Sequence, residues 1–372
     1  MGIRGQVLVF VGLSCGMAMA IAACSSFGEV VSSPPDAQAT PLDAAEDRPL
    51  PSGPDASVED TGAADAPAPG TKCSVRTVST IRGVQRVQRY LDKLYFSDAK
   101  NVYVCAADAC VPSVLAQNEN DVRSLTVGPG YAFWLAASGT PGVTVVRRLS
   151  LSSASPVTVP SPGNFVSLHL TSGAAPELLL MGSHLYRSSP SNDDLTTLPN
   201  VVDFYYQPAE IALTSLGNRV LYNHPTASVA PPGPHVCEEG AFCQSARPVV
   251  AVKAAISALG IDGSELYYAY DTSLYRATVG GATSDGGVPV PGAPLSSFNG
   301  SSVSFVDPSG ADIVVLTKDA QSNGLVRFAP KSTMPTATFQ ACPIKSKAPT
   351  SASADSDEIF VADDTGILAY HR

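Results

Sequence analysis

The chain has 372 residues and a formal net charge of −10; 44% of the residues are hydrophobic and only 15% are charged. This length allows one large domain or two ordinary ones, with enough apolar surface for a sizeable core. The 30 glycines and 31 prolines favour many short strands joined by turns. The basic residues form no stripe that could neutralise a phosphate backbone, so the sequence argues against a nucleic-acid partner.

The N-terminus has the features of an export signal. Arg4 gives it a positive start, and an apolar run from Val7 to Ala23 is followed by Cys24. This run is marginal for crossing a bilayer, which needs about 20 strongly apolar residues, because it is shorter and rich in small side chains. Residues 1–23 are therefore expected to be a signal peptide.

The tetrapeptide Ile21-Ala22-Ala23-Cys24 resembles the lipobox of bacterial lipoproteins. The resemblance implies cleavage before Cys24, a diacylglyceryl group on its thiol, and acylation of the new amine. Three acyl chains would anchor the protein firmly to a membrane. Ser25 and Ser26 stand where such lipoproteins often carry an Asp for retention at the inner membrane, so the resemblance implies an extracytoplasmic location at the outer membrane. The alternative is ordinary cleavage near Ala23, which would leave a soluble protein.

Residues 24–72 are expected to form a disordered acidic tether. Between residues 25 and 71, nine acidic side chains face Arg48 as the only base, which gives this segment a charge of −8. Its proline, alanine and serine content cannot bury enough apolar surface to offset the entropy of ordering. From Lys72 onward the charge is only −3 and apolar runs begin, so a folded domain is expected over residues 73–372.

One pattern of short strands and Gly/Asp/Ser turns recurs seven times in this domain. The central strands are Leu94–Phe96, Ala132–Trp134, Leu178–Leu180, Val220–Tyr222, Leu266–Tyr268, Ile313–Val315 and Ile359–Val361. They begin 38 to 47 residues apart, a spacing typical of four-stranded propeller blades, which repeat at about 40–50 residues. We predict a single all-β propeller with seven four-stranded blades, with six or eight blades as alternatives.

The two ends of the domain predict how the ring closes. The last unit ends one strand short of four, whereas Cys73–Thr80 is strand-like and precedes the first unit. A four-stranded sheet cannot bury both of its faces alone, so the blades must pack in a closed ring. We therefore expect Cys73–Thr80 to be the outer strand of the last blade.

Two segments resemble the repeats of known propeller families. Leu94-Tyr95-Phe96-Ser97-Asp98 resembles a degenerate YWTD repeat, and Ile359–Gly366 resembles the strand and turn of an NHL repeat. Both families are β-propellers, typically with six blades, and YWTD domains of receptors bind protein partners. The resemblance implies a fold and a binding role without specifying a ligand.

The cysteine spacing predicts two local disulfides. Six cysteines follow Cys24, and an even number in an oxidising compartment indicates three disulfides. Cys105 and Cys110 flank a hairpin between the third and fourth strands of one unit, and Cys237 and Cys243 flank the matching place three units later. Each of these pairs is expected to form a disulfide.

By elimination, Cys73 is expected to pair with Cys342, which would attach the closing strand to the adjacent blade. The alternative for the six thiols is a metal site. Zinc sites usually contain pairs separated by two to four residues, a spacing that the local pairs barely meet or exceed. No metal site is therefore predicted.

No residue is predicted to be catalytic or to bind a cofactor. The sequence lacks the motifs of zinc proteases, serine hydrolases, EF-hands and phosphate-binding loops. His169 is expected on an innermost strand near the channel, where it is an ordinary polar side chain or, alternatively, a ligand or base. Trp134 is expected in the core.

Two sets of charged residues recur at equivalent places in several units. Asp98, Asp271 and Asp363 follow central strands and are expected to accept backbone N–H bonds in turns. Four arginines near strand ends are interpreted as solvated, with an anion-binding ring as the alternative: Arg147, Arg187, Arg276 and Arg327.

Together these features favour a membrane-anchored, non-enzymatic binding or scaffold module, expected to be a monomer. A protein or glycan ligand is expected at loops over the channel, with Val279–Asn299 and His224–Pro234 as candidates. One alternative is an extracytoplasmic enzyme, such as a lyase, lactonase or glycan hydrolase, acting at the channel mouth. The other is a structural envelope protein without a dedicated ligand.

Overall fold

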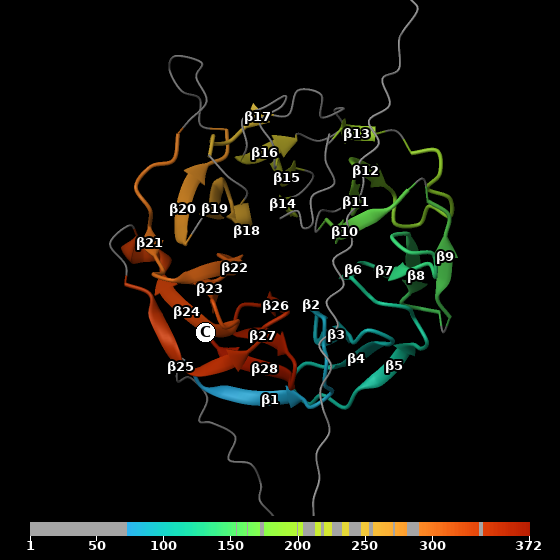
Figure 1. Cartoon of the computed structure of the whole chain (residues 1–372), viewed down its shortest axis with the longest axis horizontal. Helices are drawn as coiled ribbons and strands as arrows, with labels where there is room; N and C mark the ends of the chain where they lie inside the picture. The colour runs from blue at the N-terminus through green and yellow to red at the C-terminus, as the bar shows by residue number, and fades with distance from the viewer. Residues whose placement is uncertain are drawn as a thin grey trace, which may run out of the picture. The chain divides into compact units, whose positions relative to one another are not determined.

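The computed structural model describes residues 73–153, 155–161, 163–171, 175–198, 200–203, 213–216, 219–224, 233–237, 247–252, 256–270, 272–280, 290–334 and 338–372. Within these residues, 28 strands form seven four-stranded antiparallel sheets, arranged as the blades of a ring (Figure 1). The domain is thus an all-β propeller, and the count is the seven that the repeat predicts rather than the six typical of YWTD and NHL propellers.

The strands of each blade are numbered from the channel outward, except in blade 7. Blade 1 contains β2 (Arg86–Tyr90), β3 (Lys93–Ser97), β4 (Val102–Ala106) and β5 (Ser113–Ala116). Blade 2 contains β6 (Ser124–Gly128), β7 (Tyr131–Ala137), β8 (Thr144–Ser150) and β9 (Val157–Val159). Blade 3 contains β10 (Phe165–Leu170), β11 (Leu178–Gly182), β12 (His184–Ser188) and β13 (Asn200–Asp203). Blade 4 contains β14 (Leu213–Leu216), β15 (Arg219–His224), β16 (Gly233–Cys237) and β17 (Arg247–Pro248).

The remaining blades follow the same order. Blade 5 contains β18 (Ile256–Asp262), β19 (Glu265–Tyr270), β20 (Ser273–Thr278) and β21 (Ser296–Ser297). Blade 6 contains β22 (Ser301–Asp307), β23 (Asp312–Asp319), β24 (Asn323–Pro330) and β25 (Gln340–Lys347), with the short 3-10 helix η2 (Lys331–Thr333) after β24. Blade 7 contains β26 (Ser351–Ala354), β27 (Glu358–Asp363), β28 (Gly366–His371) and, outermost, β1 (Val75–Ser79).

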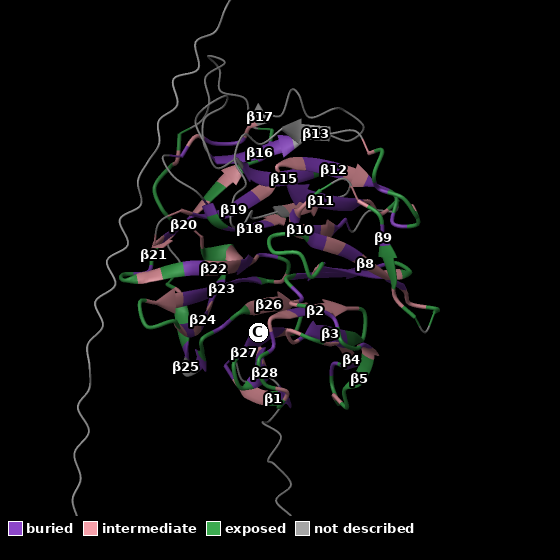
Figure 2. Ribbon diagram, turned by 45° about the vertical axis from the view of Figure 1, so that its right-hand side comes forward, coloured by how far each residue is buried: buried purple, intermediate pink, exposed green. Residues whose placement is uncertain are grey.

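The core lies between neighbouring blades, which explains why the central strands are apolar at successive positions. Successive residues of a strand point to opposite faces of its sheet. In β3, Leu94 and Phe96 pack with Phe360 of blade 7, whereas Tyr95 packs with Trp134 of blade 2. Each central strand is therefore buried on both faces (Figure 2). Trp134 is fully buried, as predicted.

The first strand of the domain closes the ring. β1 pairs antiparallel with β28, with Val75 opposite Tyr370 and Thr77 opposite Leu368, so the outer strand of the last blade comes from the N-terminal end of the domain, as predicted. The turn before β28 fits closely against β1. A Cβ on Gly366 would lie 2.0 Å from the Ser79 carbonyl oxygen, and its φ of +148° suits glycine.

Aspartates fix the turns between the second and third strands. Asp98 Oδ1 accepts hydrogen bonds from the backbone N–H groups of Lys100 and Asn101, both at 2.7 Å. Asp363 Oδ1 accepts from Thr365 N at 2.8 Å and Gly366 N at 3.1 Å. Both aspartates therefore have the predicted role, whereas Asp271 lies outside the described residues.

In Asp98, burial alone would raise the pKa, but hydrogen bonds from Lys100, Tyr103 and Asn101 outweigh it and lower the pKa of this carboxyl. Asp319 likewise fixes the turn between the second and third strands of blade 6, where its Oδ1 accepts a hydrogen bond from Gln321 N at 2.9 Å.

No helix in the described part of the chain has the length and hydropathy that a membrane crossing requires.

Candidate functional site in the central channel

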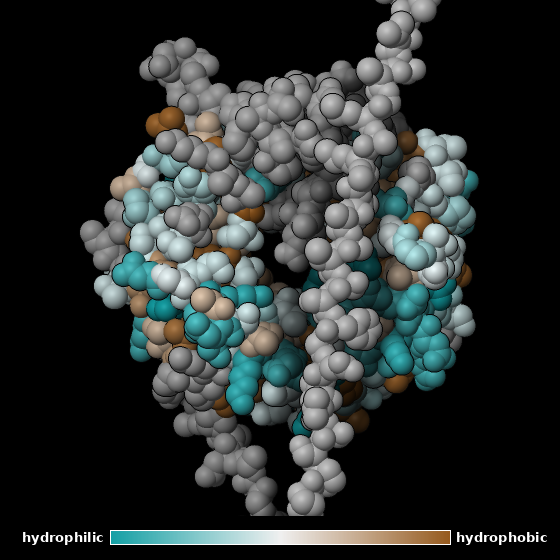
Figure 3. All heavy atoms as spheres, viewed as in Figure 1, coloured by the Kyte–Doolittle hydropathy of each residue, from teal (hydrophilic) through white to brown (hydrophobic). Residues whose placement is uncertain are grey.

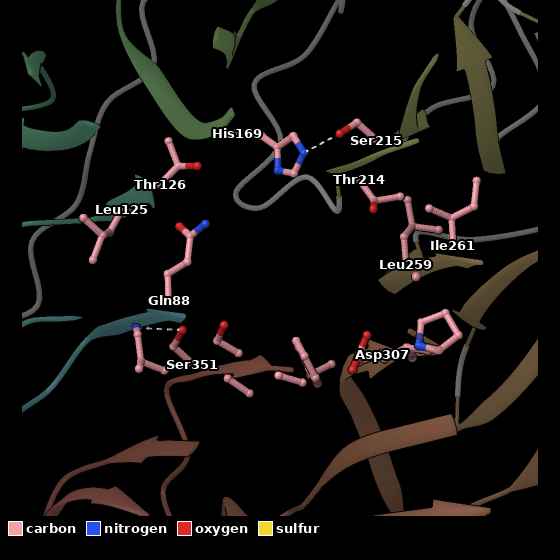
Figure 4. Close-up of a pocket in the computed structure, with 18 of the residues that line it drawn as sticks. Gln88, Leu125, Thr126, His169, Thr214, Ser215, Leu259, Ile261, Asp307 and Ser351 are labelled. Carbon is pink, nitrogen blue, oxygen red and sulfur yellow. Dashed lines mark hydrogen bonds between the residues drawn. The ribbon is translucent and has the colours of Figure 1, made fainter. Parts of the chain in front are cut away.

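The inner strands of all seven blades line one central channel. They enclose a cavity of about 450 Å³ whose walls include Gln88 of β2, Thr126 of β6, His169 of β10, Ser215 of β14 and Asp307 of β22. These side chains surround a common space (Figure 4). In this lining, polar side chains alternate with apolar residues of the inner strands such as Leu125, Leu168 and Phe305.

Inner-strand side chains hydrogen-bond to the exposed edge of the next blade. An inner strand pairs on one side only, so its other edge presents backbone N–H groups to the channel. Ser351 Oγ of blade 7 accepts from Val87 N at 3.3 Å, and Ser353 Oγ accepts from Arg89 N at 2.8 Å. These hydroxyls satisfy the edge of blade 1 across the ring closure.

Similar bonds join blades 1, 2 and 3. Ser124 Oγ and Thr126 Oγ1 of blade 2 accept from the backbone N–H groups of Leu168 and Leu170 in blade 3, at 3.1 and 3.0 Å. Gln88 makes two bonds with Val127: its Oε1 accepts from Val127 N at 2.9 Å, and its Nε2 donates to Val127 O at 3.1 Å. The serines and threonines of the inner strands thus connect the blades as well as lining the channel.

His169 occupies the channel, as the sequence predicts. Its Nε2 lies 2.9 Å from Ser215 Oγ, within hydrogen-bonding distance (Figure 4). Burial lowers the pKa of His169 to about 4, because the protonated ring would lose hydration. At neutral pH the ring is therefore uncharged, and it joins blade 3 to blade 4 as a polar, neutral contact.

One end of the channel opens into a second cavity of about 560 Å³ with a cationic rim. The rim contains Arg86 at the start of β2, Arg123 just before β6, and Lys318 near the end of β23. Phe305 and Ser351 line both cavities, so the two spaces adjoin. The space-filling view shows a hollow at the centre of the ring with hydrophilic side chains near it (Figure 3). We call this cavity the cationic mouth.

At the other end of the inner strands, charges are paired with one another. Arg372, whose side chain is only 4% exposed, places its Nη1 2.7 Å from Asp307 Oδ2 and its Nη2 3.1 Å from Asp312 O. Lys331 forms an ion pair with Asp262. These contacts pair Asp307 and Asp262 with cations at this end of the channel.

The four strand-end arginines do not form a ring; each is bonded near its own blade. Arg147 Nη2 lies 3.0 Å from Glu119 Oε1, Arg187 pairs with Glu177, and Arg276 Nε lies 3.4 Å from Glu265 Oε2. The fourth arginine, Arg327 of β24, donates from its Nε to Thr317 Oγ1 at 3.2 Å, and its guanidinium lies over the Phe298 ring. Arg147 and Arg187 are thus largely shielded from solvent and paired with carboxylates, whereas Arg276 is paired but exposed, as the interpretation of a solvated strand end expects.

Two of the predicted cysteine pairs are disulfides in the structure. Cys105 and Cys110 are bonded at the end of β4, and Cys73 is bonded to Cys342, with Cα atoms 5.1 Å apart. Cys243 lies outside the described residues, so its disulfide with Cys237 stays a prediction. The lipid anchor at Cys24, the tether, and residues 225–232 and 281–289 of the two candidate ligand loops also lie outside the described residues, so these predictions stay untested. Among the described residues, no group of three or more His, Cys, Asp or Glu side chains could hold a metal ion.

Seven four-stranded blades closed around a polar channel define the class of the domain: it is a seven-bladed β-propeller, distantly similar to WD40 propellers. It resembles a chain of the mitotic checkpoint complex, with 13% identity and a TM-score of 0.57 over 81% of this chain and 94% of that one. It also resembles the WD40 propeller domain of Doa1, with 13% identity and a TM-score of 0.55 over 81% of this chain and 96% of that one.

A third similar structure is PorZ, a bacterial surface component of the type-IX secretion system of Porphyromonas gingivalis, with 13% identity and a TM-score of 0.52. Here the likeness covers 79% of this chain and 37% of PorZ. At such identities these likenesses establish the fold alone. The sequence matches no known protein family and no curated protein, so neither the YWTD nor the NHL resemblance gains support.

Proposed function

We propose that this protein is a lipid-anchored, extracytoplasmic binding module that takes its ligand at the cationic mouth of the propeller channel. The observation that carries the proposal is the convergence of inner strands on one polar cavity that opens into a second one with Arg86, Arg123 and Lys318 at its rim. Ligand sites are concave and orient the ligand through convergent polar groups, and the mouth brings such groups together around one cavity.

The proposed location rests on the sequence. The lipobox-like Ile21–Cys24 supports a lipid anchor at Cys24, and the acidic segment 24–72 supports a tether that holds the propeller away from the membrane. Disulfides such as Cys73–Cys342 persist in oxidising compartments, which supports an extracytoplasmic site. PorZ, a bacterial surface component that resembles this fold over 37% of its length, offers a fold-level analogy for such a location. The module is proposed to act as a monomer and without a cofactor.

Binding arrays of glycans and peptides, probed with the full mature chain, test the binding role. The matched variant is Ser257→Trp, which places a bulky side chain at an exposed position of the mouth. We expect array ligands that bind the wild type to lose binding to Ser257→Trp. Ligands that bind both proteins equally would place the site elsewhere, and a chain that binds nothing would favour the structural envelope role.

The contact between His169 and Ser215 favours a second candidate, an enzyme acting in the channel. A neutral imidazole 2.9 Å from a serine hydroxyl can accept its proton as a general base. Mass spectrometry of bound array ligands after incubation tests this candidate. Products that form with the wild type, and no longer form with His169→Ala or Ser215→Ala, would replace the binding role with catalysis.

A further inference from the structure

We propose that the Cys105–Cys110 disulfide of blade 1 is a redox-sensitive latch on the ring closure, a contact that holds the closing strand only while the bond is intact. The inference goes beyond the proposed function, because it concerns how the ring is held closed and not what the channel binds. The disulfide closes a short loop between β4 and β5, and this loop contacts blade 7, where β1 completes the ring.

The loop receives the closing strand through one arginine. Arg76 of β1 donates from its Nη2 to the Ala107 carbonyl oxygen at 2.8 Å and from its Nη1 to the Asp108 carbonyl oxygen at 3.4 Å. Both acceptors lie between the two bonded cysteines. The same guanidinium pairs with Glu358 of β27, so the position of the loop decides whether Arg76 can bond to both blades at once.

Ala107 also packs into the apolar contact between the two blades. Its side chain is 2% exposed and belongs to a cluster that contains Val78 of β1 and Phe360 of β27. Its backbone N–H donates to the Asp92 carbonyl oxygen at 3.0 Å, which fixes it against the β2–β3 turn of its own blade. The loop is therefore a bridge from blade 1 to the closing strand.

The disulfide limits how far this loop can move. Cys105 and Cys110 are five positions apart, and the bond between them holds their Cα atoms 4.9 Å from each other. Without this bond, the exposed residues Asp108 and Ala109 gain backbone freedom, and ordering them again for Arg76 costs conformational entropy. Reduction should therefore weaken the bonds between Arg76 and the loop, and with them the attachment of β1.

A reductant can reach this disulfide more easily than the one between Cys73, just before β1, and Cys342 of β25. Cys110 is half-buried, whereas Cys73 and Cys342 are 8% and 1% exposed. The thiolate of a dithiol attacks Cys110 Sγ, the S–S bond breaks, and the Cys105 thiolate leaves. The second thiol of the reductant then resolves the mixed disulfide, so the protein gains two thiols and the dithiol becomes a disulfide.

Hydrogen–deuterium exchange of the full mature chain under non-reducing conditions tests the latch through the amides of β1. The wild type, Arg76→Gln and Arg148→Gln are each compared with and without the substitutions Cys105→Ser/Cys110→Ser. Arg148→Gln is the matched control, because Arg148 of β8 likewise donates from its guanidinium to loop carbonyl oxygens of the next blade, but between blades 2 and 3.

We expect loss of the disulfide to speed the exchange of β1 about fivefold or more in the wild type and in Arg148→Gln, as for weakened hydrogen bonds to a charged donor. In Arg76→Gln the exchange should already be fast, and loss of the disulfide should add little, because the disulfide acts through this arginine. Unchanged exchange of β1 without the disulfide, or an equal acceleration in the wild type and Arg76→Gln, would overturn the latch.

Titration of the folded wild type with dithiothreitol tests the redox step, with free thiols labelled and assigned by peptide mass spectrometry. We expect Cys105 and Cys110 to be labelled at dithiol concentrations that leave Cys73 and Cys342 unlabelled, and the exchange of β1 to rise over the same range. Labelling of Cys73 at the same or a lower concentration, or no labelling of Cys110 in the folded protein, would overturn the redox-sensitive role.

Discussion

Arg76 and Glu358, 282 positions apart in the sequence, form a two-pronged ion pair. Arg76 Nε lies 2.9 Å from Glu358 Oε1, and its Nη2 lies 2.7 Å from Oε2. The same Nη2 donates to the Ala107 carbonyl of blade 1 at 2.8 Å. One guanidinium therefore joins the closing strand β1 to the rest of blade 7 and to blade 1, so it reinforces the ring where the two ends of the domain meet.

Breaking this pair should lower the stability of the ring. With side chains 28% and 23% exposed, the pair is partly shielded from water, so we expect Glu358→Gln and Arg76→Gln each to lower the free energy of unfolding by about 1–2 kcal/mol. Chemical denaturation of the single and double variants gives the coupling energy. The exposed pair Arg123–Asp121, also at 2.7 Å, is the control, and a coupling no larger than that of this pair would contradict the closing role.

The two disulfides should differ in their effect because they close loops of very different length. Cys73 and Cys342 are 269 positions apart, whereas Cys105 and Cys110 are five apart. Loop-closure entropy predicts a loss of about 5 kcal/mol for the Cys73→Ser/Cys342→Ser variant and about 2 kcal/mol for Cys105→Ser/Cys110→Ser. Equilibrium unfolding under non-reducing conditions measures both. Equal losses, or a larger loss for the local pair, would argue against Cys73–Cys342 as a closure of the ring.

Stability should fall in mildly acidic solution because of His169. Its folded-state pKa of about 4 lies below the unfolded value of about 6.5, so the unfolded chain binds more protons between these values. The stability that comes from the neutral ring is present above pH 6.5 and is lost as the pH falls through about 4. We expect a decrease on the order of 2–3 kcal/mol over this range. In the variant His169→Gln the decrease should be smaller by that amount, and an unchanged pH profile would contradict the assignment.

Glycine at position 366 should be required for ring closure. An alanine Cβ there would meet the Ser79 backbone oxygen at 2.0 Å, so either β1 or the turn must move. We expect Gly366→Ala to lower the melting temperature by several degrees, a loss of about 2–4 kcal/mol. Gly130→Ala is the control, because Gly130 also has a positive φ but no atom lies within 4 Å of its added Cβ; its loss should stay near 1 kcal/mol.

The sequence was sufficient to predict the blades because their burial follows from the chain itself. Central strands such as Leu94–Phe96 and Ile359–Val361 are apolar at successive positions, and only sheets covered on both faces have this pattern. The spare strand at Val75–Ser79 and the missing one after His371 together predicted the closure. Likewise, an even number of cysteines and two local pairs left Cys73 and Cys342 as the remaining partners.

The cationic mouth could not be predicted because its residues are scattered along the chain. Arg86, Arg123 and Lys318 each look like an ordinary charged residue at a strand end, and only the closed ring brings them to one cavity. The bond between Ser353 and Arg89 links positions 264 residues apart and depends on which strand edge faces the channel. The one usable signal was position, since Arg86 and Arg123 stand at the starts of inner strands.

Hydrogen–deuterium exchange of the full mature chain, with and without a glycan or peptide that binds it on the arrays, tests most directly whether the ligand occupies the channel. We expect slower exchange on binding in the inner strands β6 (Ser124–Gly128), β18 (Ile256–Asp262) and β22 (Ser301–Asp307), which line the mouth, and no change in the outer strands β5 and β9. Slower exchange confined to outer strands, with the inner strands unchanged, would contradict a binding site in the channel.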